Sequence, residues 1–261
     1  MSSQELAMNQ CKNLVYSSKF ESFGLVDGPG VRSIIFLSGC PFKCLYCHNV
    51  EMQDFKCGKP INVDDTFNKL IRYKNYWKDN GGVTISGGEP LCHIDFLIEL
   101  GKKLKERNIS YVIDTSLATF SLDESFLKKF DELLSLSTLF LVDIKAINNN
   151  LHKQITGKVN KNVLEGIKYL NDKNFPIWIR YVLVPSLTDK EIDLIKTRDF
   201  IKTLNNVERV EVLPYHTLAL PKYEKLHIDY LLKGTKPPSK EAIEKAKEIL
   251  EVSHYNKWKT K

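Results

Sequence analysis

The sequence has 261 residues, of which 43% are apolar and 27% are charged, a balance that excludes wholesale disorder. The 38 basic and 32 acidic side chains leave a net charge of +6 with no block of like charges, so the charge does not indicate nucleic-acid binding. The apolar runs are too short for a membrane span, and residues 1–19 lack the apolar core of a secretory signal. We expect a cytoplasmic protein that acts on neither membranes nor nucleic acids.

Short runs rich in valine, isoleucine and aromatic residues alternate along the chain with longer amphipathic segments. The predicted strands are 31–38, 83–86, 111–114, 139–144, 177–184 and 207–213. The predicted helices are 64–78, 94–107, 123–134, 161–172, 190–204 and 240–252. Asp64, Asp123 and Ser239 provide start signals for three of these helices.

Strict alternation of strands and helices predicts an α/β fold with a parallel sheet and right-handed crossovers. A closed eight-unit barrel needs about 250 residues, but here six units share the chain with residues 1–30 and 214–238. We therefore expect a partial, open-sided (β/α)6 TIM-like barrel, with a doubly wound open sheet as the alternative. No linker divides the chain, so we expect a single domain over 19–261, preceded by a leader (1–18) of unknown role.

Glycines, cysteines and polar residues follow the predicted strands where each strand ends. These segments are Gly39–Asn49, Ser86–Pro90, Asp114–Thr115, Asp143–Lys145 and Pro214–His216, and Arg180 lies within the fifth strand. Because the carboxyl ends of parallel strands form the active-site face of such folds, we expect the segments to converge. This arrangement is typical of an enzyme.

Three of the six cysteines, Cys40, Cys44 and Cys47, lie within eight residues as C-x3-C-x2-C, and no second pair follows them. Structural zinc sites use four ligands, commonly from two separated pairs, and His48 is too close to Cys47 to serve easily as the fourth. Three soft thiolates suit a 4Fe–4S cluster that keeps one iron open to a substrate. Zinc and three unrelated thiols remain the alternatives.

This cysteine run, with Tyr46 before its last cysteine, resembles the radical S-adenosylmethionine (SAM) superfamily. Six segments, collinear over residues 19–252, are similar to the family of pyruvate formate-lyase activating enzymes. They are Ser22–Arg32, Tyr46–Asn49, Ser86–Pro90, Asp143–Lys145, Trp178–Val182 and Leu213–His216. The cysteine run alone indicates the superfamily, and the whole set indicates the narrower family.

The resemblance implies that Cys40, Cys44 and Cys47 hold a 4Fe–4S cluster whose fourth iron binds the amino and carboxylate groups of SAM. Lys145 would join these cysteines as a catalytic residue, meeting the SAM carboxylate or ribose as a point charge. The remaining SAM contacts would come from Tyr46, His48, Asn49, Gly87, Gly88, Glu89, Asp143, Ile144, Arg180 and His216. Among them, Gly87 and Gly88 would let backbone approach the methionine moiety, and Glu89 would accept from its ammonium.

Two further groups of residues are implied to act beside SAM. Asp114, Thr115 and Asp143 resemble a monovalent-cation site, because converging carboxylates favour a cation; a helix cap is the alternative for Asp114. Asp27, in a Gly-Pro-Gly turn before the first predicted strand, is expected to accept backbone N–H groups from a loop of the protein substrate. A structural histidine is the alternative for His216.

The resemblance further implies the reaction. One electron from the cluster would split SAM into methionine and a 5′-deoxyadenosyl radical, which removes hydrogen from a glycine Cα of pyruvate formate-lyase. Flavodoxin or ferredoxin would supply the electron. Cys57 is the only cysteine between Cys47 and Ser86, so no second cluster can be built there.

Three other functions stay open from the sequence. One is activation of a different glycyl-radical enzyme, because some of those activators also lack extra clusters. Another is a radical SAM reaction on a small molecule or RNA, although the chain adds no RNA-binding module. The third is an electron carrier or zinc module without enzymatic activity.

Overall fold

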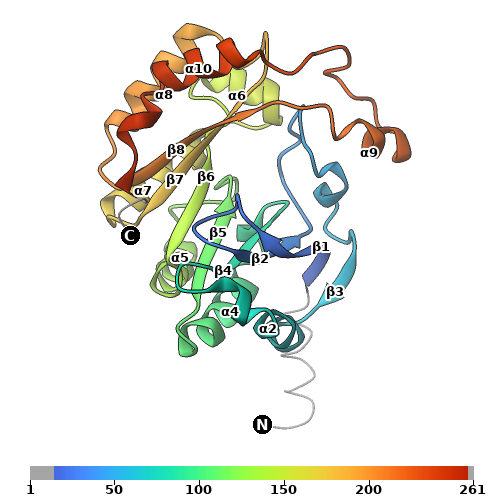
Figure 1. The fold of residues 1–261 in the computed structure, drawn as a ribbon, viewed down its shortest axis with the longest axis vertical. Coiled ribbons are helices and arrows are strands. Elements are labelled where there is room, and N and C mark those ends of the chain that lie inside the picture. The colour runs from blue at the N-terminus through green and yellow to red at the C-terminus, as the bar shows by residue number, and fades with distance from the viewer. Residues whose placement is uncertain (1–14, 258–261) are drawn as a thin grey trace. The chain divides into compact units, whose positions relative to one another are not determined.

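Alternating strands and helices run through residues 15–257, the part of the chain that the computed structural model describes (Figure 1). The strands are β1 (Val15–Gly24), β2 (Arg32–Leu37), β3 (Lys59–Ile61), β4 (Gly82–Gly87), β5 (Ser110–Thr115), β6 (Leu139–Asp143), β7 (Ile177–Leu183) and β8 (Val207–Pro214). The α-helices are α2 (Val63–Ile71), α3 (Lys74–Trp77), α4 (Ile94–Glu106), α5 (Glu124–Leu136), α6 (Asn149–Thr156), α7 (Lys161–Asp172), α8 (Glu191–Lys202), α9 (Leu220–Lys225) and α10 (Lys240–Ile249). Three 3-10 helices are η1 (Val50–Gln53), η2 (Pro90–His93) and η3 (Val252–His254).

The strands form an open sheet in the order β3-β1-β2-β4-β5-β6-β7-β8. The pairs β2–β4, β4–β5 and β7–β8 are parallel, as the alternation of strands and helices predicts. The predicted α/β fold, a partial, open-sided (β/α)6 TIM-like barrel with a parallel sheet, is therefore confirmed. The prediction missed β1 and β3, which run antiparallel at one edge. Most of β1 is only half-buried, so its sequence lacks the continuous apolar run of the central strands.

Contacts divide the chain into two compact units. Unit 1 holds the described residues up to Cys40 together with Met52–Thr115 and Ser121–Phe140. Unit 2 holds Pro41–Glu51, Ser116–Phe120 and the described residues from Leu141 onward.

In unit 1, α2 packs beside α4 and α4 beside α5. Its core contains a fully buried arginine, Arg32, which donates to Thr84 Oγ1 (2.6 Å) and to the carbonyls of Val83 (2.6 Å) and Ser110 (3.1 Å). Burial lowers the pKa of Arg32 to about 9, although Asp27 opposes this shift. Arg32 thus joins the start of β2 to β4 and β5 through hydrogen bonds.

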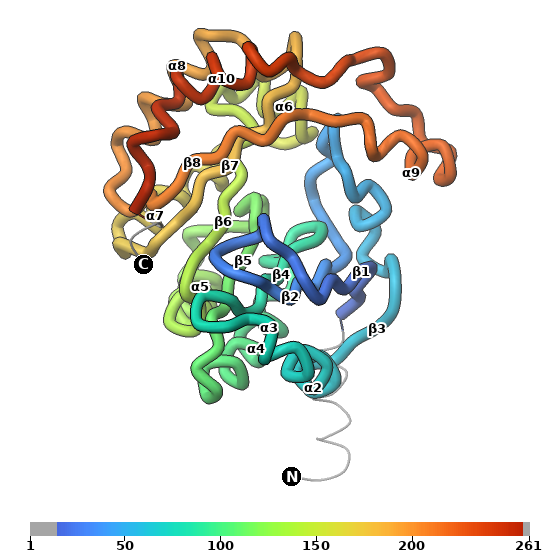
Figure 2. The backbone as a smooth tube through the Cα atoms, in the orientation of Figure 1, coloured from blue at the N-terminus to red at the C-terminus, as the bar shows by residue number. Residues whose placement is uncertain are grey.

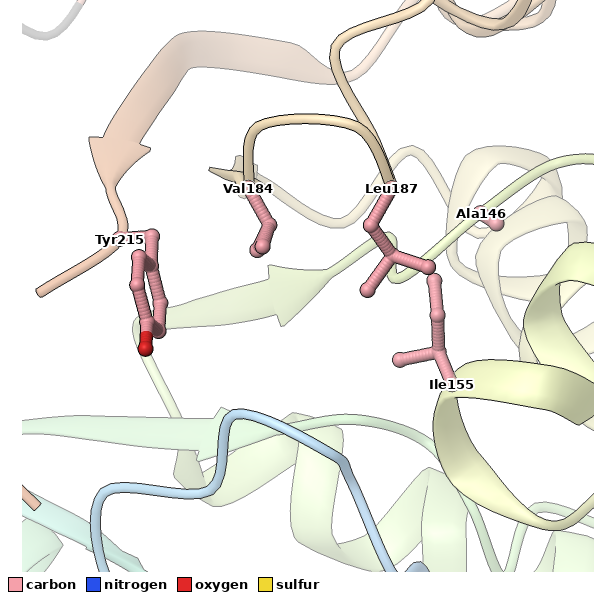
Figure 3. Packing of buried hydrophobic residues seen from close by; sticks show 5 residues of the cluster. All are labelled: Ala146, Ile155, Val184, Leu187 and Tyr215. Atoms are coloured by element: carbon pink, nitrogen blue, oxygen red, sulfur yellow. The ribbon is translucent and has the colours of Figure 1, made fainter. Parts of the chain in front are cut away.

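In unit 2, α10 lies along α8 and also contacts β8 (Figure 2). A separate cluster of buried side chains joins the loop after β6, α6, the loop after β7 and the end of β8 (Figure 3). The cluster consists of Ala146, Ile155, Val184, Leu187 and Tyr215. Leu45 and Tyr46 pack against it, so this cluster supports the segment that carries two of the three clustered cysteines.

The helices predicted at 94–107, 123–134, 161–172, 190–204 and 240–252 are present with ends shifted by at most three residues. The single helix predicted at 64–78 is wrong: α2 ends at Ile71 and α3 begins at Lys74. The break lets Trp77 enter the core, where its Nε1 donates to Ser33 Oγ at 2.9 Å. The N-cap of α2 is Asn62 rather than Asp64. The short helices α6 and α9 were not predicted.

Candidate active site

The cysteine loop begins directly after β2, at a glycine with a positive φ. Gly39 has φ +101°, and a Cβ there would overlap the Phe55 ring, so only glycine allows the chain to leave the strand in this way. Its N–H donates to Met52 O (2.7 Å). Cys40 follows Gly39 immediately, and the first segment of unit 1 ends at Cys40.

The rest of the cysteine loop belongs to unit 2, where backbone hydrogen bonds to α6 hold it. Lys43 N donates to Thr156 O and Leu45 N to Ile155 O, both at 2.9 Å. Cys47 N donates to Cys44 O at 3.1 Å, closing a turn between the second and third cysteines. Backbone hydrogen bonds therefore set the path of this segment without using its side chains.

The donor chemistry of the loop fits an iron–sulfur cluster. Cys40, Cys44 and Cys47 are partly exposed thiols outside any disulfide, and thiolates are the usual protein ligands of such clusters. Burial raises the pKa of the Cys44 thiol to about 12, against the opposing effect of Lys145. A coordinating metal displaces the thiol proton outright, so this pKa describes the thiol before a metal binds.

Two glycines at the end of β4, Gly87 and Gly88, closely approach other backbone atoms of unit 1. A Cβ on Gly87 (φ +121°) would overlap Leu37 O, and one on Gly88 would overlap Gly39 O. Gly88 N donates to Leu37 O at 2.8 Å. Because these two glycines have no side chains, the end of β4 can pack directly against the start of the cysteine loop. This role is in addition to the predicted contact with SAM.

Glu89 with Thr115, and Asp114 with Ser86, form two hydrogen-bonded pairs inside unit 1. Glu89 is fully buried, and its Oε1 accepts from Leu91 N (3.0 Å) and Thr115 Oγ1 (2.5 Å). Asp114 Oδ2 accepts from Ser86 Oγ at 2.7 Å. Asp114 lies within β5, so its alternative reading as a helix cap is wrong. The roles of Glu89 toward SAM and of Asp114 and Thr115 toward a cation stay predictions.

In unit 2, two cations share one carboxylate at the end of β6. Lys145 Nζ lies 2.8 Å from Asp143 Oδ2, and Arg180 Nε lies 3.1 Å from Asp143 Oδ1. The three side chains are only 11–17% exposed. Ile144, which is buried, donates its N–H to Arg180 O at 3.0 Å and so aligns β6 with β7. The structure thus brings together four residues that the sequence analysis assigned to SAM.

These contacts change the pKa of both members of the ion pair. Burial raises the pKa of Asp143, but Arg180 and Lys145 outweigh that effect and hold the pKa below its ordinary value. Burial lowers the pKa of Lys145, and the charge of Asp143 more than reverses this, leaving the pKa above its ordinary value. Both side chains are charged near neutral pH, so they can present a fixed dipole to a zwitterionic ligand.

Unit 2 also contains two aromatic contacts among the predicted SAM residues. The Lys145 ammonium lies 5.8 Å from the centroid of the Tyr46 ring, and His48 meets His216 edge to face at 5.1 Å. Tyr46 Oη is buried with no hydrogen-bond partner in the described residues, and burial raises the pKa of this phenol. Tyr46, His48 and His216, which are predicted to contact SAM, therefore all belong to unit 2.

Asp27 lies in a turn whose backbone is fixed to the core of unit 1. Thr84 Oγ1 donates to Asp27 O at 2.7 Å, and Arg32 donates to Pro29 O at 3.1 Å. Leu25 and Val26, just before it, are exposed. Core side chains thus hold the backbone of this turn, while the side chains of Leu25 and Val26 face solvent.

Sequence reasoning missed two residues of α9 that contact the end of the cysteine loop. Lys222 Nζ donates to His48 O, Asn49 Oδ1 and Glu51 Oε1, and Tyr223 Oη donates to Cys47 O. No local pattern around 220–225 indicates these contacts, because their partners lie more than 170 residues earlier in the chain.

A comparison with protein families matches residues 34–197 to the radical SAM superfamily. The pyruvate formate-lyase-activating enzyme of Streptococcus mutans is 43% identical over 241 residues, which are 92% of each chain. The enzyme of the same name from Staphylococcus epidermidis is 44% identical over 87% of this chain and 91% of its own.

A solved domain of a pyruvate-formate lyase-activating enzyme from Bacteroides vulgatus has a similar fold. It aligns with a TM-score of 0.55 and 26% identity, over 67% of this chain and 96% of that domain. The chain therefore belongs to the radical SAM superfamily and, within it, to the family of pyruvate formate-lyase-activating enzymes.

Among the helices within residues 15–257, we find none whose length and apolar content would suffice to span a membrane.

Proposed function

We propose that this chain activates pyruvate formate-lyase, using a 4Fe–4S cluster on Cys40, Cys44 and Cys47 and consuming SAM. Held by these cysteines, the cluster would pass one electron from an external reductant to SAM, whose S–C5′ bond would break to release methionine. The 5′-deoxyadenosyl radical would then take a hydrogen atom from a glycine Cα of the lyase. The protein binds and orients SAM and keeps water away from the radical. The observation that carries this proposal is the 43% identity over 92% of both chains, together with the C-x3-C-x2-C loop.

The two ion pairs of Asp143, with Lys145 and with Arg180, explain how SAM would be oriented. Lys145 and Arg180 are two cationic donors already aligned on Asp143, so a ligand carboxylate meets fixed donors and little side-chain entropy is lost on binding. Asp143 in turn is an acceptor for an ammonium or a ribose hydroxyl. Tyr46 and His216 offer ring faces and edges for an adenine.

We further propose that the chain acts in the cytoplasm, with flavodoxin or ferredoxin as reductant, and that residues 19–261 act as one domain. The cysteines of the described residues lie outside any disulfide, as is usual for proteins of a reducing compartment. Asp114, Thr115 and Asp143 are the proposed ligands of a monovalent cation beside SAM.

The experiment that tests the activity is an anaerobic assay with the chain, SAM, a reductant and pyruvate formate-lyase. We expect an electron paramagnetic resonance signal of a glycyl radical on the lyase and stoichiometric 5′-deoxyadenosine. A radical on another glycyl-radical enzyme but none on pyruvate formate-lyase would favour the alternative activase. Cleavage of SAM that depends on RNA or a small molecule, with no glycyl radical, would overturn the proposal.

The same assay tests the role of Asp27 as the contact for the lyase's glycine loop. We expect Asp27→Ala to lower glycyl-radical formation about tenfold or more, the loss of one charge-assisted hydrogen bond. Lyase-independent SAM cleavage is expected to stay intact, because the cluster and SAM contacts come from other segments. Spin counting and chromatography measure the two quantities in one reaction.

The control for this substitution is Asp95→Ala, which removes an exposed carboxylate of the same unit that pairs with Lys129. It is expected to leave both signals unchanged. Equal loss of both signals in Asp27→Ala would show that the turn supports the fold or the cluster site, and the docking role would be wrong.

A further inference from the structure

Lys222 makes three hydrogen bonds to the segment that follows the third cysteine. Its Nζ lies 2.9 Å from His48 O, 3.0 Å from Asn49 Oδ1 and 2.7 Å from Glu51 Oε1. A lysine ammonium has three N–H donors, so these three acceptors match its full donor capacity. All four residues belong to unit 2.

The neighbouring Tyr223 fixes the helix that carries Lys222. Tyr223 is buried, packs with Val50 and Ala219, and donates from Oη to Cys47 O at 3.2 Å. Its ring meets Tyr230 edge to face at 4.7 Å. Lys222 is therefore held at its base by packing, and its ammonium position is set by the helix as well as by its partners.

The bond to Asn49 determines what that side chain can offer a ligand. A carboxamide has an acceptor oxygen and a donor nitrogen on opposite sides. When Lys222 occupies Oδ1, the amide can rotate only by losing a charge-assisted bond and setting its NH2 group against the ammonium. Asn49 then presents its two N–H donors on the side away from Lys222.

We propose that Lys222 is a positioning residue that fixes Asn49 as a hydrogen-bond donor toward the nucleoside part of SAM. This inference rests on the proposed function, because it requires SAM at the site. A donor at that position matches the ribose oxygens and the ring nitrogens of adenine, which are acceptors. The salt bridge to Glu51 balances the ammonium charge, so the effect of Lys222 is on geometry more than on net charge.

The test compares Lys222→Met, which removes the donors, with Lys222→Arg, which keeps a cation with N–H groups. Lys225→Met is the matched control, because Lys225 is an exposed lysine on the same helix. For each reconstituted protein we would measure iron per chain, SAM affinity by anaerobic calorimetry, and the paramagnetic resonance spectrum of the reduced cluster with and without SAM. Lys222→Gln replaces the methionine variant if that variant does not fold.

We expect Lys222→Met to keep its iron and its SAM-free spectrum. It should bind SAM about tenfold more weakly, because one hydrogen bond to the ligand is lost. Lys222→Arg should recover part of that affinity, and Lys225→Met should match the unmodified protein. In an Asn49→Ala background, Lys222→Met should have no further effect on SAM affinity, because the two residues act through one contact.

Three results would overturn the inference. They are unchanged SAM affinity in Lys222→Met, loss of iron in parallel with SAM affinity, and additive effects of Lys222→Met and Asn49→Ala. Failure of the proposed function is distinguishable from all three, because it appears in the unmodified protein. That protein would then either not bind SAM, or bind it without forming a glycyl radical on pyruvate formate-lyase.

Discussion

Alanine at Cys40, Cys44 or Cys47 is expected to abolish SAM cleavage. Each thiolate is one of only three protein ligands to the cluster, so no fourth cysteine compensates for its loss. We expect the visible absorption of the cluster and the iron content to fall together, with no detectable 5′-deoxyadenosine. Retained cleavage in Cys44→Ala, or zinc in place of iron in anaerobically purified protein, would refute the assignment.

Cys57→Ala and Cys92→Ala are the matched controls for this prediction. Cys57 contributes its carbonyl to Ser38 Oγ (2.7 Å), a backbone contact that alanine preserves. Cys92 lies on η2, outside the cysteine loop, and burial raises the pKa of its thiol to about 12. Both variants should keep iron and activity. Cys11, which the sequence also predicts to tolerate alanine, lies outside the described residues.

Asp143→Asn is expected to destabilise the protein by about 3 kcal/mol, because it leaves two poorly exposed cations, Lys145 and Arg180, without their shared carboxylate. For a chain of this size, that loss corresponds to a fall in melting temperature of roughly 6–12 °C. Anaerobic calorimetry of the reconstituted protein measures it. SAM binding should weaken in the same variant, because its cationic donors lose their alignment.

The pH dependence of this loss follows from the shifted pKa values. The pKa of Asp143 lies below its ordinary 3.8 in the folded protein, so its stabilisation is complete above that pH and is lost as the pH falls through the folded value. The pKa of Lys145 lies above 10.5, so its contribution is complete below that pH. The difference between Asp143→Asn and the unmodified protein should therefore be constant between these limits and shrink in acid.

Asp199→Asn serves as the control for the ion-pair prediction, because Asp199 is 56% exposed and pairs with its neighbour Arg198 at the surface. Exposed pairs contribute about 0–1 kcal/mol, so its melting temperature should barely change. An Asp143→Asn variant that melts like Asp199→Asn would show that Lys145 and Arg180 find other partners.

The local sequence pattern was sufficient to predict the central strands and most of the helices. Strands such as β6 and β7 are mostly buried, and the apolar runs 139–142 and 177–179 are therefore visible in the sequence. The edge strand β3 and its neighbour β1 are mostly half-buried or exposed and pair antiparallel, so they carry a weaker apolar signal. The break between α2 and α3 depends on burial of Trp77 against Ser33, a contact across 44 residues that no local window contains.

For the site, the sequence by itself determined the type of chemistry. Three thiols at C-x3-C-x2-C spacing favour an iron–sulfur cluster over zinc, because ligand identity and local spacing are properties of the chain. Likewise, polar residues after strands predict a common active-site face, because strand direction places their ends at one edge of a parallel sheet.

Only the tertiary structure decided which side chains meet. It joined Asp143 to Arg180 across 37 residues and Lys222 to Asn49 across 173, and it placed Gly88 against Gly39 rather than leaving it open to a ligand alone. Such pairings depend on how strands and helices pack at long sequence separation. Motif spacing cannot encode them, since the two partners of each pair lie far apart in the chain.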